Sequence, residues 1–258
     1  MRLWLFPLLL LSVAGCGQSK PAPVRQSFCA ERNFEGARFT VCDNRSGELR
    51  LFAAGKGDTP VRSFAGLMRR VDPDRVAFAM NAGMFDEEGR PIGYAVVDGR
   101  ELHKLNLKDG PGNFHLKPNG VFIAGCGRAA MVVPSDAIAS LRCAPHFASQ
   151  SGPMLVIGGK LHPKLQADGQ SRLIRNGVGV RDGKALFVTS ESAVSLGKFA
   201  RFFRDELKTP NALYFDGSVS SLWDPANGQQ DSHSELGPII VAFKPEASTP
   251  GHAGHARP

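Results

Sequence analysis

The sequence lacks a block of basic residues, even though its formal net charge is +7. Its 31 lysines and arginines are spread along the chain, without the clustered charge, interleaved aromatic residues or known motif of a nucleic-acid-binding protein. No internal repeat of useful length is present. We therefore expect no nucleic-acid partner. The excess positive charge is compatible with an anionic substrate, and equally with a solvated surface.

The sequence also lacks a hydrophobic run long enough for a comfortable transmembrane span. The apolar stretch at residues 3–13 follows a basic residue and runs into Val13-Ala14-Gly15-Cys16, which resembles the lipobox of bacterial lipoproteins. We expect a signal peptide over residues 1–15, lipidation of Cys16 and a flexible tether over residues 16–28. The mature protein would then be lipid-anchored in the bacterial cell envelope, on the periplasmic or extracytoplasmic face. The alternative is an ordinary signal peptide with an incidental cysteine.

Cysteine is scarce, and its spacings are unlike a zinc-binding CxxC pair. Four cysteines remain after Cys16: Cys29, Cys42, Cys126 and Cys143. In the oxidising compartment of an exported protein an even set predicts two disulfides, with three possible pairings. We favour the two short loops, Cys29 with Cys42 and Cys126 with Cys143, over metal binding. The histidines also lack ligand spacing such as HExxH, so we expect no metal and no cofactor.

Short apolar runs separated by glycine-containing turns dominate the rest of the chain. The pairs Asp98-Gly99, Gly158-Gly159 and Asp182-Gly183 predict two-residue β-hairpins, because glycine tolerates the positive φ that these turns require. Apolar residues at helical spacing predict two helices, over residues 61–71 and 196–207, each followed at once by an apolar strand.

These patterns predict an α+β fold, with a mixed, mainly antiparallel sheet and helices packed against it. We expect a single domain over residues 29–244. The segment 245–258 is rich in Pro, Ala, Gly and His without an apolar period, and predicts a disordered tail.

Three apolar strands end at a polar residue: Asn81, Glu191 and Asp216. Strand ends are common places for chemistry, because the following loop frees a polar group while the strand holds its position. A helix connects the last two strands, which should therefore be parallel and deliver Glu191 and Asp216 to the same edge of the sheet. A two-residue turn at Asp182-Gly183 fixes the register of the two strands that it joins, so that Arg175 on one strand faces Ser190 on the other. Arg175 is therefore predicted to lie beside the edge that carries the two carboxylates.

Two carboxylates and an arginine at one edge suit the hydrolysis of a glycosyl phosphate. One carboxylate can stabilise the oxocarbenium centre while the other handles a proton. Arginine can hold phosphate oxygens through two parallel hydrogen bonds. The alternative for Asp216 is a simple turn residue, because exposed Asp-Gly pairs are common in turns.

Five segments follow one another along the chain: NAGMFDEEGRPIGYAVVDGRELHKLN (81–106), GPGNFHLKPNGVFI (110–123), SGPMLVIGGKL (151–161), RLIRNGVGV (172–180) and NALYFDGSVSSLW (211–223). They resemble the successive blocks of the phosphodiester glycosidase family, and the resemblance covers about residues 37–243. The family includes an animal enzyme that removes N-acetylglucosamine from a phosphodiester on mannose. In many members the last block is an Asp followed by glycines and serines, a run that Val219 interrupts here.

The resemblance implies hydrolysis of a glycosidic bond to phosphate, which releases sugar and leaves a phosphomonoester. It also implies a set of pocket-lining residues: Asn81, Gly83, Gly152, Arg175, Asn176, Asp216, Gly217 and Ser218. In the GNFHLKPNG block, His115 and Lys117 either contact substrate phosphate or belong to an exposed loop. A nucleophilic Ser218 is disfavoured, because no G-x-S-x-G motif surrounds it.

We therefore expect a monomeric, lipid-anchored glycosidase that acts on a glycosyl phosphate or phosphorylated glycan. Asp216 and Glu191 would be its carboxylates, Arg175 its phosphate or transition-state clamp, and Asn81 a hydrogen-bonding positioner. One alternative is a non-catalytic envelope lipoprotein that binds glycan. A second is a hydrolase that cleaves the phosphorus side of the bond.

Overall fold

The computed structural model describes residues 26–43, 47–127 and 129–246. The expected signal peptide, the lipidation site Cys16, and most of the expected tether and tail lie outside the described residues. Within the described part, no helix has the length and apolar character needed to cross a membrane.

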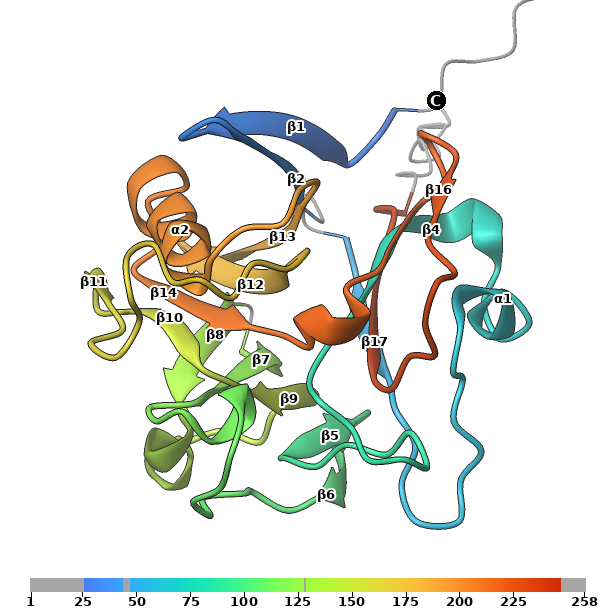
Figure 1. Cartoon of the computed structure of the whole chain (residues 1–258). Coiled ribbons are helices and arrows are strands. Elements are labelled where there is room, and N and C mark those ends of the chain that lie inside the picture. The colour runs from blue at the N-terminus through green and yellow to red at the C-terminus, as the bar shows by residue number, and fades with distance from the viewer. Residues whose placement is uncertain (1–25, 44–46, 128, 247–258) are drawn as a thin grey trace, which may run out of the picture.

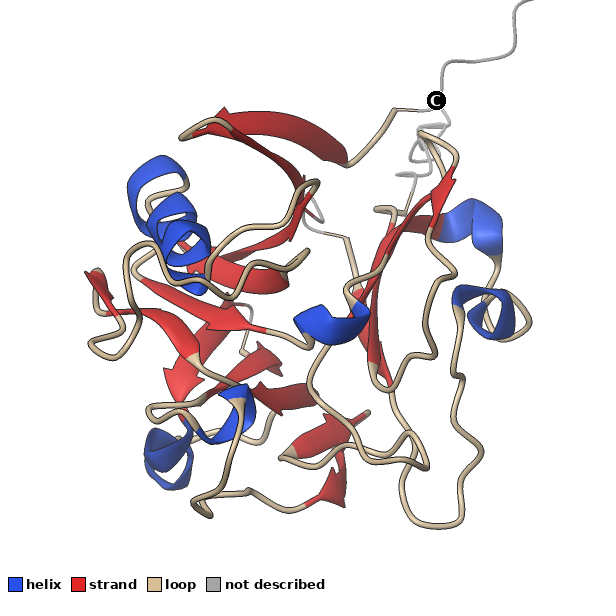
Figure 2. Cartoon of the chain, in the orientation of Figure 1, coloured by secondary structure: helices blue, strands red, loops and turns tan. Residues whose placement is uncertain are grey.

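Three antiparallel β-sheets account for most of the described chain (Figures 1 and 2). The largest has seven strands in the order β1-β2-β13-β12-β14-β10-β11. Its strands are β1 (Cys29–Phe34), β2 (Ala37–Asp43), β10 (Met154–Ile157), β11 (Lys160–Leu161), β12 (Asn176–Arg181), β13 (Lys184–Ser190) and β14 (Asn211–Tyr214).

Two five-stranded sheets pack beside it. One has the order β16-β15-β4-β17-β3 and the other β6-β5-β9-β7-β8. The strands of the first are β3 (Leu49–Phe52), β4 (Val76–Asn81), β15 (Leu222–Asp224), β16 (Gln229–Gln230) and β17 (Ile239–Phe243). Those of the second are β5 (Ala95–Val97), β6 (Arg100–His103), β7 (Gly120–Cys126), β8 (Ala129–Pro134) and β9 (Phe147–Ser151).

The three sheets share one apolar core. Phe187 on β13 lies at their meeting point, because its ring packs edge-on against Phe78 of β4 at 5.4 Å and Phe122 of β7 at 5.5 Å. All three rings are fully buried. Burial of side chains of this size stabilises a fold by about 1.5–3 kcal/mol each, so this contact holds the three sheets together.

The predicted α+β class, with a mixed sheet and packed helices, is wrong. Every strand pairing in the described chain is antiparallel, and only two short α-helices occur there. Strands β13 and β14 do run in the same direction, but β12 lies between them and is antiparallel to both. The helical connection thus passes over one strand position, and no parallel pair forms.

The first predicted helix is much shorter than its apolar pattern suggested. Only α1 (Phe64–Leu67) is helical, with Ser63 as its N-cap. Arg62 has a φ of +64°, which is incompatible with helix before this cap. Phe64 and Leu67 are nevertheless buried in a cluster with Trp223, so the apolar spacing reports burial rather than helix length.

The second predicted helix is confirmed as α2 (Leu196–Arg201), which continues into a π-helical turn, η4 (Phe202–Glu206). It covers one face of the largest sheet with buried phenylalanine rings. Four short 3₁₀ segments complete the helical elements described: η1 (Pro73–Arg75), η2 (Asn113–His115), η3 (Ser135–Ser140) and η5 (Gly217–Val219).

The three predicted hairpin turns are confirmed. Both residues of Asp98-Gly99, Gly158-Gly159 and Asp182-Gly183 have positive φ, and the flanking strands pair directly. The register predicted from the last turn also holds as far as the sheet edge, where the Ser190 backbone N–H donates to the Arg175 carbonyl at 2.8 Å.

Both favoured disulfides are present. Cys29 is bonded to Cys42 across the β1–β2 hairpin, and Cys126 to Cys143. Disulfides are typical of proteins that fold outside the reducing cytoplasm, so they favour an extracytoplasmic location.

Candidate active site

Asp216 lies two residues after the end of β14 and caps the turn η5, which lies between the largest sheet and the sheet that contains β4 (Figure 1). One oxygen of its carboxyl, Oδ1, accepts hydrogen bonds from the Ser218 backbone N–H at 3.2 Å and from the Ser218 hydroxyl. Burial raises the pKa of the Asp216 carboxyl above its usual value, and the two bonds from Ser218 offset part of this rise. A carboxylate with a raised pKa at a strand end is a stronger base than an ordinary one, which suits a role in proton transfer.

Two buried asparagines hold the backbone of this turn. The Asn81 side chain donates from Nδ2 to the Asp216 carbonyl at 2.8 Å, and its Oδ1 accepts from the Ser221 N–H at 2.8 Å. Asn176 donates from Nδ2 to both oxygens of Asn81, at 2.8 and 2.9 Å. Because both ends of the Asn81 amide are engaged with protein, the structure places it as a positioner of the Asp216 turn. Asn176 Oδ1 is buried and has no hydrogen-bond partner among the described residues.

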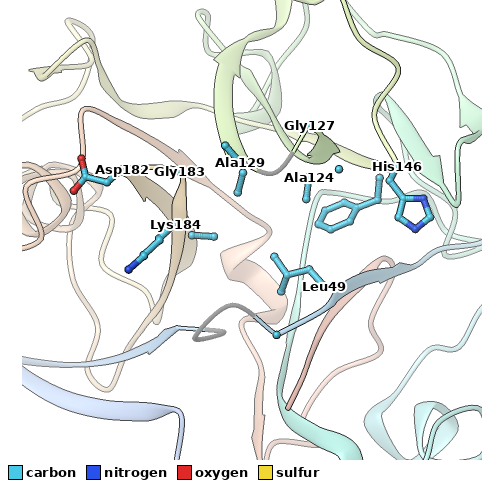
Figure 3. A pocket seen from close by; sticks show the side chains of 13 residues that line it. Leu49, Ala124, Gly127, Ala129, His146, Asp182, Gly183 and Lys184 are labelled. Carbon is cyan, nitrogen blue, oxygen red and sulfur yellow. The ribbon is translucent and has the colours of Figure 1, made fainter. Parts of the chain in front are cut away.

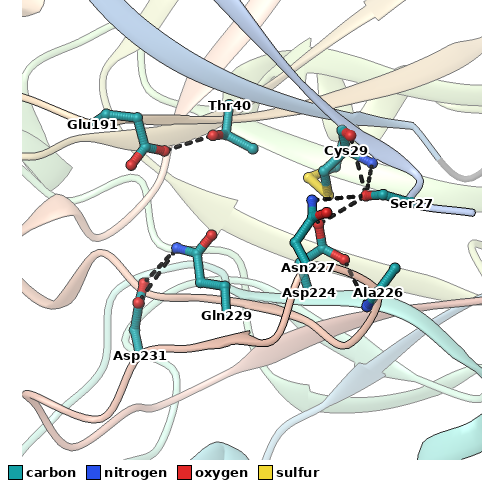
Figure 4. Close-up of a disulfide and its surroundings, with 10 residues drawn as sticks. Ser27, Cys29, Thr40, Glu191, Asp224, Ala226, Asn227, Gln229 and Asp231 are labelled. Carbon is teal, nitrogen blue, oxygen red and sulfur yellow. Dashed lines mark hydrogen bonds between the residues drawn. A yellow bond between two sulfur atoms is a disulfide. The ribbon is translucent and has the colours of Figure 1, made fainter. Parts of the chain in front are cut away.

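Glu191 lies just beyond β13 and turns toward β2. Its Oε1 accepts a hydrogen bond from the Thr40 hydroxyl at 2.6 Å (Figure 4), and its backbone N–H donates to the Arg38 carbonyl at 2.9 Å. Thr189, the cross-strand partner of Thr40, has its hydroxyl 3.4 Å from that of Ser220 in the loop after Asp216. A row of hydroxyls therefore runs from Glu191 toward the Asp216 loop.

The predicted common edge for Glu191 and Asp216 holds at the level of the backbone. They follow the same ends of β13 and β14, which are separated by β12. Two strand spacings correspond to roughly 10 Å between backbones. No direct contact joins the two carboxylates in the described structure, so their cooperation in catalysis stays a prediction.

The Arg175 side chain is buried on the face of the sheet that α2 covers. Its guanidinium donates from Nε to the Val194 carbonyl at 2.8 Å, from Nη1 to the Tyr214 hydroxyl at 3.0 Å and from Nη2 to the Ser171 carbonyl at 2.8 Å. The residue is only 1% exposed. A direct grip on phosphate would require one of these bonds to be exchanged, so the clamp role also stays a prediction.

Three glycines of the family blocks lie where no side chain fits. A Cβ on Gly83 would lie 2.3 Å from the Gln150 carbonyl oxygen, and one on Gly152 would lie 2.6 Å from the Phe114 carbonyl oxygen. On Gly217 it would lie 2.1 Å from the Tyr214 hydroxyl. These glycines therefore permit close backbone packing around the strand ends, whatever they contribute to substrate binding.

His115 and Lys117 hold a loop in the described structure. His115 Nδ1 lies 3.0 Å from the Lys108 carbonyl oxygen. Lys117 Nζ donates to the Leu107 carbonyl at 2.6 Å and forms an ion pair with Asp109 at 2.7 Å. These contacts fit the exposed-loop alternative, and phosphate binding by either residue stays a prediction.

A cavity of about 510 Å³ lies at the opposite end of β12 and β13 (Figure 3). It is lined by the Asp182-Gly183 turn, Lys184, His146 and small residues of β7 and β8. We favour the strand ends near Asp216 over this cavity as the site, because they carry the partly buried Asp216 carboxyl and the family blocks. Among the described residues, no group of three or more His, Cys, Asp or Glu side chains could hold a metal ion.

Tyr214, Thr40 and Ser220 were not predicted as site residues. Tyr214 carries a detectable signal in the sequence, because a tyrosine two residues before Asp216 in an otherwise apolar strand needs a partner for its hydroxyl. Thr40 and Ser220 carry none, because each reaches the site through a contact between side chains far apart in sequence, 151 residues in one case and 31 in the other.

Comparison with known proteins finds relatives of this chain in sequence and in fold. The chain is 30% identical over 224 residues to the uncharacterised Escherichia coli protein YigE, a match that covers 86% of this chain and 83% of that protein. In fold it is similar to the catalytic domain of zebrafish N-acetylglucosamine-1-phosphodiester alpha-N-acetylglucosaminidase, with a TM-score of 0.58, 15% identity, and coverage of 88% of this chain and 85% of that one.

A hypothetical protein from Synechocystis has a similar fold, with a TM-score of 0.52, 18% identity and coverage of 84% of this chain. This chain spans 61% of that protein. The family model for phosphodiester glycosidases matches residues 74–237, a segment that includes β4, Arg175, Glu191 and Asp216. The chain belongs to the phosphodiester glycosidase family.

Proposed function

We propose that the protein hydrolyses the glycosidic bond of a glycosyl phosphodiester in the bacterial cell envelope. Water adds to the anomeric carbon, the bond from that carbon to the phosphate oxygen breaks, and the phosphate leaves as a phosphomonoester. Membership of the family supports this reaction class. The two disulfides and the lipobox-like segment support the location.

The observation that carries the proposal is the Asp216 carboxyl, partly buried at the end of β14 with a raised pKa. A phosphate leaving group is already acidic and needs little protonation. Asp216 is therefore best used as the group that accepts a proton from the attacking water. Glu191 would stabilise positive charge on the sugar ring, with Thr40 orienting its carboxylate.

The test uses the full chain in mild detergent with a panel of sugar-1-phosphodiesters and matching simple glycosides, and identifies products by mass spectrometry. We expect free sugar and phosphomonoester, with turnover reduced at least about a hundredfold in Asp216→Asn. The control is Asp182→Asn, which alters an exposed carboxylate in a hairpin turn at the far end of the sheet. Asparagine tolerates the positive φ of that position, so this variant should retain activity.

The products also separate the alternatives. Sugar phosphate instead of free sugar would indicate cleavage on the phosphorus side. Saturable glycan binding without turnover, in wild type and Asp216→Asn alike, would instead indicate a binding lipoprotein.

A further inference from the structure

The buried guanidinium of Arg175 has an unusual environment. Its described hydrogen-bond partners are all neutral oxygens: two backbone carbonyls, the Ser171 hydroxyl and the Tyr214 phenol. A buried cation without an adjacent carboxylate is costly unless negative charge lies within reach of its field. Of these partners, Tyr214 also approaches the Asp216–Gly217 turn.

Tyr214 lies between Arg175 and the Asp216 turn. Its hydroxyl accepts from Arg175 Nη1 at 3.0 Å, and the guanidinium carbon lies 5.4 Å from the centre of its ring. On the other side the hydroxyl is so close to Gly217 that a Cβ there would lie 2.1 Å away. The phenol is 1% exposed, so it acts within the protein and not on solvent.

A tyrosine hydroxyl has one proton to donate and lone pairs that accept. Arg175 donates to the oxygen from one side, and the backbone of Gly217 interacts with it from the other. Burial raises the pKa of the Tyr214 phenol. The charge of Arg175 acts to lower this pKa, and the charge of Asp216 acts to raise it, so the phenol lies within the field of both groups.

We propose that Tyr214 is a positioning residue that couples the buried Arg175 to the Asp216–Gly217 turn, and so sets the orientation of the Asp216 carboxyl. The effect of Tyr214 on the reaction rests on the proposed function, in which Asp216 is catalytic. The contacts that join Arg175, Tyr214 and the turn are a property of the fold and do not depend on it. Arg175 then acts on the reaction through Tyr214, without touching substrate. Gly217 is required because any side chain there would displace the phenol.

The first test needs no substrate. The chain has two tyrosines, Tyr94 and Tyr214, so labelling tyrosine with ¹³C at Cζ gives two NMR signals. Between pH 3 and 8, where neither phenol ionises, we expect the Tyr214 signal to shift as Asp216 titrates, and this step to vanish in Asp216→Asn. The Tyr94 signal serves as the internal control and should lack the step. Absence of the step in wild type, or its persistence in Asp216→Asn, would overturn the proposal.

The second test uses Tyr214→Phe, which keeps the ring and removes only the hydroxyl. Loss of the coupling should shift the Asp216 titration, followed by carboxyl ¹³C NMR, away from its wild-type midpoint. In the active enzyme kcat should fall about ten- to a hundredfold at nearly constant KM, the size expected for one hydrogen bond to a charged group. The limb of the pH–rate profile due to Asp216 should move in the same direction.

Tyr94→Phe, outside the site, should leave all these quantities unchanged. An unshifted Asp216 titration in a folded Tyr214→Phe protein would refute the coupling. If no substrate of the proposed class is turned over, the proposed function fails while the NMR results still decide the role of Tyr214.

Discussion

Replacing Asn81 with alanine should destabilise the protein, because this side chain joins the end of β4 to the turn that carries Asp216. It is 1% exposed and forms three side-chain hydrogen bonds with other residues. The substitution removes these bonds and leaves the main chain of both elements in place. Its effect therefore measures how strongly the amide network holds the candidate site.

The expected loss follows from what each partner retains. The Ser221 N–H loses its only described acceptor. The Asp216 carbonyl keeps a longer contact of 3.4 Å from the Val219 N–H, and Asn176 Nδ2 keeps the Asn81 carbonyl at 2.9 Å. A buried group left without a partner costs about 1–3 kcal/mol, so one fully orphaned and two weakened groups predict a loss of about 2–4 kcal/mol in the free energy of unfolding.

Urea unfolding followed by fluorescence would measure this loss, with an unchanged m-value as the sign that the unfolding reaction is the same. The control is Asn33→Ala, an exposed asparagine on β1, which should change the free energy by no more than about 0.5 kcal/mol. A loss below about 1 kcal/mol in Asn81→Ala, with activity unchanged, would refute the positioning role of the amide network.

Three further predictions concern the candidate site. At pH 7, Asp216→Asn should unfold at a higher temperature than wild type. Burial raises the pKa of the Asp216 carboxyl, so folding favours its protonated form. The carboxyl therefore contributes its full stability below its unfolded pKa and loses that contribution as the pH rises through its folded pKa. The gain should disappear as the pH falls below the usual carboxyl value of 3.8, and a variant no more stable at pH 7 would contradict the burial argument. Gly217→Ala should cost about 1–3 kcal/mol by forcing a Cβ against the Tyr214 hydroxyl, whereas Gly169→Ala, with no atom nearer than 3.6 Å, should be nearly neutral in the same unfolding assay. Glu191→Gln should lower kcat at least about tenfold if Glu191 stabilises the transition state, and unchanged kcat would remove it from the mechanism.

Local sequence chemistry was enough to predict the hairpins and their register. The Asp182-Gly183 pair needs positive φ at both positions, which selects a two-residue turn and thereby pairs residues from Arg181 and Lys184 to Asn176 and Thr189. The short disulfide loops followed from export and from the even number of cysteines. The resemblance of five blocks to one family was sufficient to identify the family itself.

The fold class could not be predicted in the same way. A helix between β13 and β14 makes those strands parallel in direction, but it does not say that β12 lies between them. Because β12 lies between them and runs the opposite way, both of its pairings, with β13 and with β14, are antiparallel. The apolar spacing after residue 60 likewise predicted burial correctly but not helix, because Arg62 adopts a left-handed conformation and contacts with Trp223 bury Phe64 without a long helix.

The sequence by itself determined that a carboxyl, Asp216, stands at the end of an apolar strand, because strand, glycine and turn chemistry are local. Only the tertiary structure decided what surrounds it. Asn81 reaches the Asp216 carbonyl across 135 residues of chain, and the Arg175 side chain turns to the face covered by α2, where it meets Tyr214. Such contacts depend on which sheets pack together and which face each side chain takes, and these are properties of long-range packing that no local pattern contains.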